Sequence, residues 1–143
     1  MFENNDFCKK CAKCCFNTEM ILTLSDITRL ESKGYRGFYE KRSGFYRLIN
    51  INGRCVFLSL SNLCLIYEDR PLGCRAYPLI YDEARGVIVD SECPLRSEIS
   101  CEDLYKGLHL LELVLREVEL TYNYRINWGL FEKSAIKLIS KCI

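Results

Sequence analysis

The sequence predicts an α+β fold in which a cysteine-rich metal-binding region with two small β-hairpins packs on one long and one short C-terminal helix. Three observations support this prediction. Cysteines crowd the front of the chain, β-rich segments flank an Asn-Gly pair, and apolar residues recur at helical spacing in the last third. We expect one domain over residues 1–143, with a cysteine-cluster region at about 8–94 and a closing helical region at about 100–142.

Charge and hydropathy exclude several classes of protein. The net charge of +1 argues against a nucleic-acid binder, which needs a broad basic face. The first twenty residues lack the apolar segment of a signal peptide. The longest stretch without charge, residues 55–67, is too short to span a bilayer. We therefore expect a cytoplasmic protein that binds neither nucleic acid nor membrane, and whose protein or small-molecule partner the sequence does not identify.

The first helix is predicted from Asp26 to about Lys33. Ser25 is a suitable N-cap because its hydroxyl can accept a hydrogen bond from a free backbone amide of the first turn, and Gly34 is a suitable residue to end the helix. The basic and aromatic residues 35–43 are expected to form a loop or a helical turn.

The clearest β signal surrounds the Asn-Gly pair at positions 52 and 53. Two β-rich runs joined by Asn-Gly are typical of a hairpin with a type I′ turn. In that register Cys55 lies opposite Asn50 and Phe57 lies opposite Leu48, so the hairpin would carry a thiol to a defined place. A second, smaller hairpin is predicted around residues 84–86.

The remaining elements are helical. Prolines in residues 61–78 favour short helical turns over strands. Ser100 and Asp103 form a capping pattern that begins a long helix ending near Tyr122, and a second helix is expected from about Leu130 to Ser140. The apolar residues expected to face the core are Leu104, Leu108, Leu111, Leu115, Val118, Phe131, Ile136 and Ile139.

The run C-K-K-C-A-K-C-C at residues 8–15 is the strongest functional signal. Two residues between cysteines allow a tight loop to aim both sulfurs at one metal centre. The adjacent Cys14 and Cys15 diverge, so they serve two centres, two irons of one cluster, or one centre with a spare thiol. The candidate metal ligands are Cys8, Cys11, Cys14, Cys15, Cys55, Cys64, Cys74 and Cys93.

Three kinds of site fit these thiols. The spacing of Cys8, Cys11 and Cys14 is similar to the loop that wraps a [4Fe–4S] cluster, and Cys93 before a proline is similar to its usual fourth ligand. Zinc also prefers four thiolates, and eight sulfurs could fill two four-coordinate sites. Disulfides are disfavoured in the cytoplasm, but the absence of glutamine is typical of thermophiles, which tolerate them.

Two further groups of residues have alternative interpretations. Lys9, Lys10 and Lys13 either offset the negative charge of a metal–thiolate centre or form a solvated loop. Cys101 and Cys142 lie outside the clustered pattern. We expect them to be small buried hydrophobic residues, with a disulfide between them as the minor alternative.

The segment C-L-I-Y-E-D-R-P-L-G-C-R-A-Y-P at residues 64–78, together with the cysteine run and Cys93, resembles a zinc- or iron-chelating family named for its C-x2-C-x2-C-C motif. The resemblance covers about residues 8–94 and maps the family's eight cysteines onto the eight candidate ligands. It implies cysteine ligation of a metal. Some longer relatives are flagellin lysine N-methylases, which the family links to an iron–sulfur centre and S-adenosylmethionine.

These observations leave three functions open. The first is an iron–sulfur or zinc protein whose centre is structural or carries electrons to a partner. The second is a small iron–sulfur-dependent enzyme, similar to a protein lysine N-methyltransferase, with Arg70, Arg75 or Tyr77 around a cofactor or substrate. The third is a zinc-stapled interaction module. Catalytic residues are not identified, because the single histidine, His109, sits in the leucine-rich helix and offers no pairing for a triad.

Overall fold

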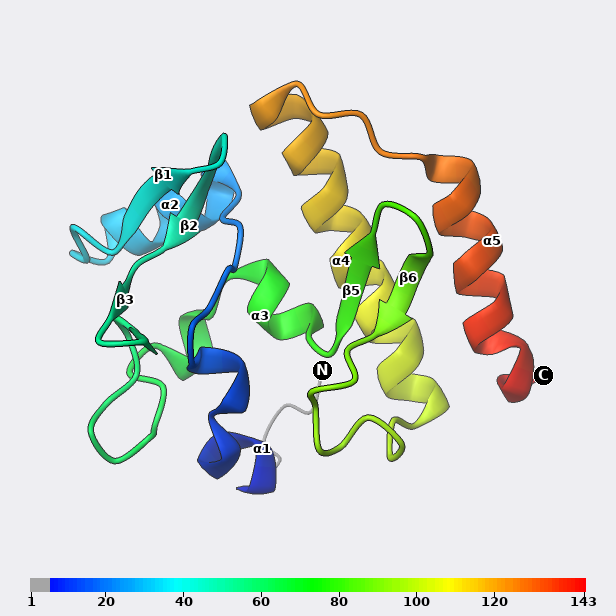
Figure 1. Cartoon of the computed structure of the whole chain (residues 1–143), viewed down its shortest axis with the longest axis horizontal. Helices are drawn as coiled ribbons and strands as arrows, with labels where there is room; N and C mark the ends of the chain where they lie inside the picture. The colour runs from blue at the N-terminus through cyan, green and yellow to red at the C-terminus, as the bar shows by residue number, and fades with distance from the viewer. Residues whose placement is uncertain (1–5) are drawn as a thin grey trace.

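The computed structural model describes residues 6–143 and confirms the α+β fold (Figure 1). Short helices and hairpins form the front of the molecule, and two longer helices close it. The α-helices are α1 (Asp6–Cys11), α2 (Leu24–Ser32), α3 (Leu72–Ala76), α4 (Cys101–Tyr122) and α5 (Trp128–Ile139), and the 3-10 helices are η1 (Lys13–Cys15), η2 (Tyr67–Asp69) and η3 (Ser140–Cys142).

Within residues 6–143 the strands form three two-stranded antiparallel sheets, one more hairpin than the sequence predicted. The extra hairpin is the first, and one of its strands lies where a loop or helical turn was expected. The pairs are β1 (Tyr39–Arg42) with β2 (Phe45–Leu48), β3 (Asn50–Ile51) with β4 (Arg54–Cys55), and β5 (Leu79–Asp82) with β6 (Gly86–Val89).

The Asn-Gly hairpin forms in the predicted place but is shorter than expected. Asn50 opposes Cys55, as predicted. The prediction that Phe57 lies opposite Leu48 is wrong, because Leu48 pairs with Tyr39 of β1. The chain turns directly after β4, where the amide of Leu58 donates to the Cys55 carbonyl at 2.8 Å. The thiol of Cys55 therefore sits at the very end of its strand.

The start of α2 also differs from the prediction. Thr23, rather than Ser25, is the N-cap. The Thr23 hydroxyl accepts a hydrogen bond from the amide of Asp26, and the Asp26 carboxylate accepts one from the amide of Thr23, which together form a capping box. Ser25 lies inside the helix and donates to Glu117 of α4 at 2.7 Å.

The two closing helices follow the predicted pattern closely. Ser100 caps α4 by accepting the amide of Asp103 at 3.0 Å, and α4 packs against α3 and β5 while α5 packs against β6 (Figure 1). Ile136 is 55% exposed, so its predicted burial is wrong, whereas Phe131 is buried. Within residues 6–143, no helix is both long and apolar enough to cross a membrane.

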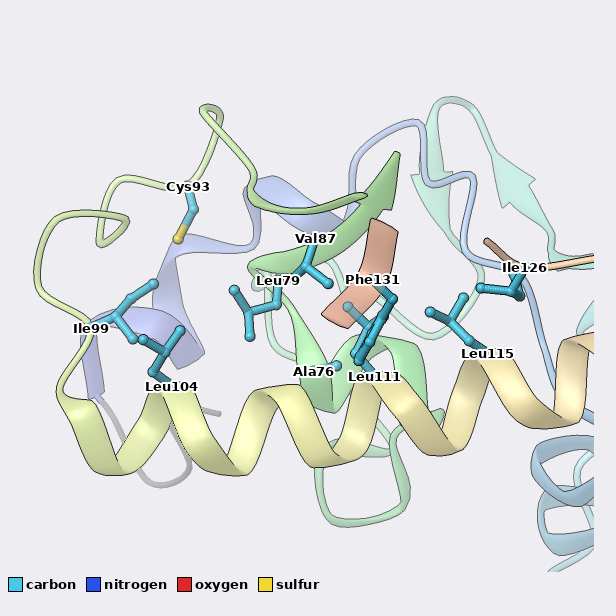
Figure 2. Close-up of a cluster of buried hydrophobic side chains, with 10 residues drawn as sticks. All are labelled: Ala76, Leu79, Val87, Cys93, Ile99, Leu104, Leu111, Leu115, Ile126 and Phe131. Carbon is cyan, nitrogen blue, oxygen red and sulfur yellow. The ribbon is translucent and has the colours of Figure 1, made fainter. Parts of the chain in front are cut away.

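Buried apolar side chains form two separate clusters. One, here the helical core, lies between α4, α5 and the β5–β6 hairpin (Figure 2). The other, here the hairpin core, joins α2 to the first two hairpins. The helical core comprises Ala76, Leu79, Val87, Cys93, Ile99, Leu104, Leu111, Leu115, Ile126 and Phe131. The hairpin core comprises Ala12, Leu22, Ile27, Leu30, Phe38, Leu48, Cys55, Phe57, Leu58 and Ile66.

The expectation that Cys101 and Cys142 are small buried hydrophobic residues is wrong. They form a disulfide across a sequence separation of 41 residues and are not inert buried thiols. The bond joins the first residue of α4 to η3 at the C-terminal end, and Cys101 is exposed to solvent. The crosslink therefore holds the final helical turn against the start of the long helix, far along the chain from the cysteine run.

Replacing Cys142 by serine is expected to lower the free energy of unfolding of the oxidised protein by about 3–4 kcal/mol, because the bond closes a long loop and restricts the unfolded chain. Denaturant unfolding with and without a thiol reductant measures this effect. Under reductant the variant and the wild-type chain should unfold alike, and the metal content should not change. Equal stability under oxidising conditions would contradict the prediction.

Candidate metal centre

The cysteine run is built from two short helical segments. Cys8 and Cys11 lie one turn apart on α1, which places their side chains on the same side of that helix. Ala12 then adopts a left-handed conformation with φ of 59°, which ends α1 and starts η1. The 3-10 helix η1 carries Cys14 and Cys15, so a sharp backbone turn separates the two halves of the run.

Backbone hydrogen bonds bring the run to the β3–β4 hairpin. Phe16 forms a β-bridge with Arg54, and the amide of Asn17 donates to the Gly53 carbonyl at 2.7 Å. The guanidinium of Arg54 also lies over the Phe16 ring, 5.1 Å from its centroid. These contacts hold η1 next to the end of β4, where Cys55 is located.

The loop that follows β4 brings Cys64 close to the end of that strand. It forms a β-bridge with Leu58, and the amide of Leu65 donates to the Phe57 carbonyl at 2.8 Å. Arg54 stabilises this loop, because its Nη2 donates a hydrogen bond to the Ser59 carbonyl at 2.7 Å.

Cys74 is positioned by α3, whose start is fixed by α2. The buried carboxylate of Asp26 accepts the amide of Leu72 at 3.0 Å, and Arg29 donates to the carbonyls of Asp69 and Arg70. Gly73, beside Cys74, packs closely against the Met20 side chain, which a Cβ at position 73 would displace.

Cys93 arrives from the loop after β6. Its amide donates to the Asp90 carbonyl at 3.2 Å, and its sulfur points back toward the N-terminal segment (Figure 2). The loop is held to the end of α3 because the amide of Asp90 donates to the Pro78 carbonyl at 2.8 Å.

The thiols line two adjoining cavities. Within residues 6–143, no three side chains of His, Cys, Asp or Glu already form the ligand set of a metal ion. Instead the cysteines surround two spaces that share Cys8 and Cys14 in their walls. The first cavity is lined by Cys8, Cys14, Cys15, Cys55, Cys64 and Cys74, and the second by Cys8, Cys11, Cys14 and Cys93.

Backbone amide hydrogen bonds favour the thiolate form of three of the cysteines. Cys55, Cys64 and Cys93 each accept a hydrogen bond from the backbone amide two residues further along the chain. Burial raises the pKa of all three thiols, and these amide hydrogen bonds oppose that rise. Amide donors that surround sulfur are typical of metal–thiolate centres, where they stabilise the deprotonated ligand.

Cys14 and Cys15 differ sharply although they are neighbours. A hydrogen bond from the Cys15 thiol lowers the pKa of Cys14 to about 7. The same bond, together with burial, raises the pKa of Cys15. Cys14 is exposed and Cys15 is half-buried. Of the two neighbours, Cys14 is therefore the more readily ionised, because the Cys15 thiol donates a hydrogen bond to it.

The predicted cofactor-binding residues take three different positions. Arg70 lines the first cavity and stacks on Tyr67, with its guanidinium 4.0 Å from the ring centroid. Burial raises the pKa of Cys8, Cys64 and Cys74, and the positive charge of Arg70 opposes that rise. At Cys14 the same charge adds to the lowering of the pKa that the hydrogen bond from Cys15 causes. Arg75 is absent from the walls of both cavities.

Tyr77 lies in the walls of both cavities and has a partner that the sequence did not single out. Its hydroxyl donates to the Asp90 carboxylate at 2.8 Å. Burial, followed by this hydrogen bond, raises the pKa of Tyr77. In the sequence, Asp90 was marked only by its position three residues before Cys93. Aspartate is common at such turns because its carboxylate can accept a hydrogen bond from the backbone amide two residues later, here that of Glu92.

Of the three lysines in the cysteine run, the structure places the side chain of Lys13. Lys13 lines the second cavity, but the side chains of Lys9 and Lys10 lie outside the described part of the chain. Beside Cys14 and Tyr77 a larger cavity of about 650 Å³ opens between the hairpins and α4. Its walls include the carboxylates of Asp90 and Glu92.

An all-sulfur donor set, gathered from five separate segments and supported by amide donors, fits a thiophilic metal centre. Neither the comparison with curated proteins nor that with solved structures returns a match. A family profile described as "CxxCxxCC: Putative zinc- or iron-chelating domain" matches residues 7–94, which include all eight candidate ligands. The chain therefore belongs to the CxxCxxCC family of zinc- or iron-chelating domains.

Proposed function

We propose that this chain is an iron–sulfur protein in which Cys8, Cys11, Cys14 and Cys93 hold a [4Fe–4S] cluster. One observation supports this proposal above the others. The second cavity is lined by the three cysteines of the C-x2-C-x2-C run together with the remote Cys93 and the proline that follows it. Three closely spaced cysteines and a distant Cys-Pro are the arrangement that [4Fe–4S] ligands commonly take.

The surrounding residues suit a redox centre. A bound cluster would supply one-electron transfer, and its four thiolates would leave a net negative charge of about two. The ring of Phe7 and the side chains of Ala12 and Leu95 line the second cavity and restrict water there. Arg70 offsets negative charge from the side of the first cavity, and Tyr77 fixes Asp90 beside the thiols.

The role we propose is electron transfer to a protein partner. Cys14 is exposed, so a centre ligated by it lies close to the molecular surface, where a partner can approach. Because such thiols must stay reduced to bind metal, we propose a reducing compartment such as the cytoplasm, in which the exposed Cys101–Cys142 disulfide would be open to reduction.

Purification without oxygen tests the proposal. The wild-type chain is expected to be brown, to contain about four iron and four sulfide per chain, and to bleach on reduction by dithionite. Cys11→Ser should lose the colour and the iron, whereas Cys142→Ser, a matched control that does not line the second cavity, should keep both. A wild-type chain that contains zinc but no iron or sulfide would overturn this proposal.

A second candidate, an iron–sulfur-dependent enzyme, is favoured by the 650 Å³ cavity that opens beside Cys14 and Tyr77. A cavity of about this size can enclose much of a small cofactor such as S-adenosylmethionine. Calorimetric titration of the iron-loaded chain with S-adenosylmethionine separates the two functions. Saturable binding would favour the enzyme, and its absence would favour the electron carrier.

A further inference from the structure

We infer a second, separate metal site, formed by Cys15, Cys55, Cys64 and Cys74, which takes a single divalent thiophilic ion of the zinc class. This site is additional to the proposed cluster and does not depend on it. Its four thiols all line the first cavity, and none of them lines the second. Conversely, Cys11 and Cys93 line the second cavity and not the first.

The two sets of thiols also belong to different hydrophobic clusters. Cys55 is part of the hairpin core, and Cys15, Cys64 and Cys74 pack against it. Cys93 is part of the helical core, and Cys8 packs against that one. For Cys15, Cys55, Cys64, Cys74 and Cys93, the packing of apolar side chains therefore agrees with the walls of the cavities.

The boundary between the sets falls inside the Cys14-Cys15 pair. The two thiols are in contact through the hydrogen bond from Cys15 to Cys14, but the residues differ in exposure, Cys14 being exposed and Cys15 half-buried. Cys14 lines both cavities, and Cys15 lines only the first. With Cys15 assigned to the first cavity, Cys14 remains for the second, and each cavity receives four thiols.

The second set favours a single ion over a cluster. Its four cysteines come from η1, β4, the following loop and α3, and no two of them share the two-residue spacing of the cluster run. A structural zinc site is closed, with four thiolates and no open position. Ala12, Leu48 and Phe57 contribute apolar side chains to the walls of the first cavity beside the four thiols.

The local structure explains what such an ion would do. The elements that carry three of these thiols are short, since β4 has two residues, η1 three and α3 five, and Cys64 lies in a loop. Elements of this length make few hydrogen bonds of their own. One ion bound to all four would crosslink the hairpin core to α3 and to the cysteine run.

Metal analysis of the full chain, purified without oxygen, tests the inference. Wild type is expected to contain about one zinc per chain beside its iron. Cys64→Ser should lose the zinc and keep the iron and the brown colour, whereas Cys93→Ser should lose the iron and keep the zinc. Cys64→His supplies a nitrogen ligand in place of sulfur and should retain zinc, which separates loss of a ligand from failure to fold.

Several results would overturn the inference. Wild type without zinc, or with about eight iron per chain, would exclude a zinc-class ion at this site. Equal loss of both metals in Cys64→Ser and Cys93→Ser, with retained helical content by circular dichroism, would show one shared centre. By contrast, a chain with one Cys64-dependent zinc and no iron would contradict only the proposed cluster and would support the second site.

Discussion

Replacing Cys74 by serine is expected to lower the zinc content and the free energy of unfolding together, by far more than an ordinary substitution. Serine is close to cysteine in size, so packing changes little, but it does not supply a thiolate. Losing a structural metal costs on the order of 10 kcal/mol of apparent folding free energy. Small domains are stable by only about 5–15 kcal/mol, so the front of the molecule should lose its fixed structure at 25 °C.

The measurement combines metal analysis with thermal unfolding followed by circular dichroism. Wild-type chain from which a chelator removes the zinc under reductant, with the iron retained, should resemble Cys74→Ser, because both lack the same crosslink. Cys142→Ser under the same reductant is the matched control and should keep its metal and its melting temperature. A Cys74→Ser variant with full metal content and an unchanged melting temperature would show that Cys74 is not a ligand.

Local signals in the sequence identified much of the fold. Asn52 and Gly53 both adopt positive φ, 53° and 77°, as a type I′ turn demands, which explains why the Asn-Gly pair located its hairpin. Ser100 located the start of α4 because a hydroxyl that accepts the amide of Asp103 is a property of three neighbouring residues. Features that depend on such short-range contacts are visible in sequence.

Features that depend on tertiary contacts were not visible. β1 is a half-exposed strand with the charged residues Glu40 and Lys41 at its centre, so its pairing with β2 has no apolar alternation to indicate it. The pairing of Cys101 with Cys142 spans 41 residues, and cysteine counting alone does not determine connectivity.

The candidate site shows the same division between local and tertiary information. The spacing of the run indicated a metal centre, and the eight thiols do surround adjoining cavities. Spacing did not indicate which cavity each thiol lines, because that depends on how segments far apart in the sequence pack together. The partnership of Tyr77 with Asp90 likewise required the fold, since the two residues meet through a hairpin.

Replacing Asp26 by alanine is expected to destabilise the protein by about 3–5 kcal/mol although Asp26 lines neither thiol cavity. Its carboxylate is fully buried and accepts the amides of Thr23 and Leu72, at 3.1 and 3.0 Å, while pairing with Arg29 at 3.2 Å. Alanine would leave two amides without acceptors and a guanidinium without its partner, which is the costly way to break a buried network.

The effect of this substitution should reach the metal. The amide of Leu72 is the first of α3, and Arg29 fixes the two carbonyls before it, so Asp26→Ala should loosen the helix that positions Cys74 and lower its zinc occupancy. Denaturant unfolding and metal analysis measure both effects. Glu112→Ala, which removes only an exposed pair with Arg116 on α4, is the control and should cost about 0.5 kcal/mol or less. The Asp26 carboxylate accepts hydrogen bonds from backbone amides at the start of both α2 and α3. If Asp26→Ala changes the free energy of unfolding by less than about 1 kcal/mol, these hydrogen bonds do not hold the two helices together, and the thiol centre alone does so.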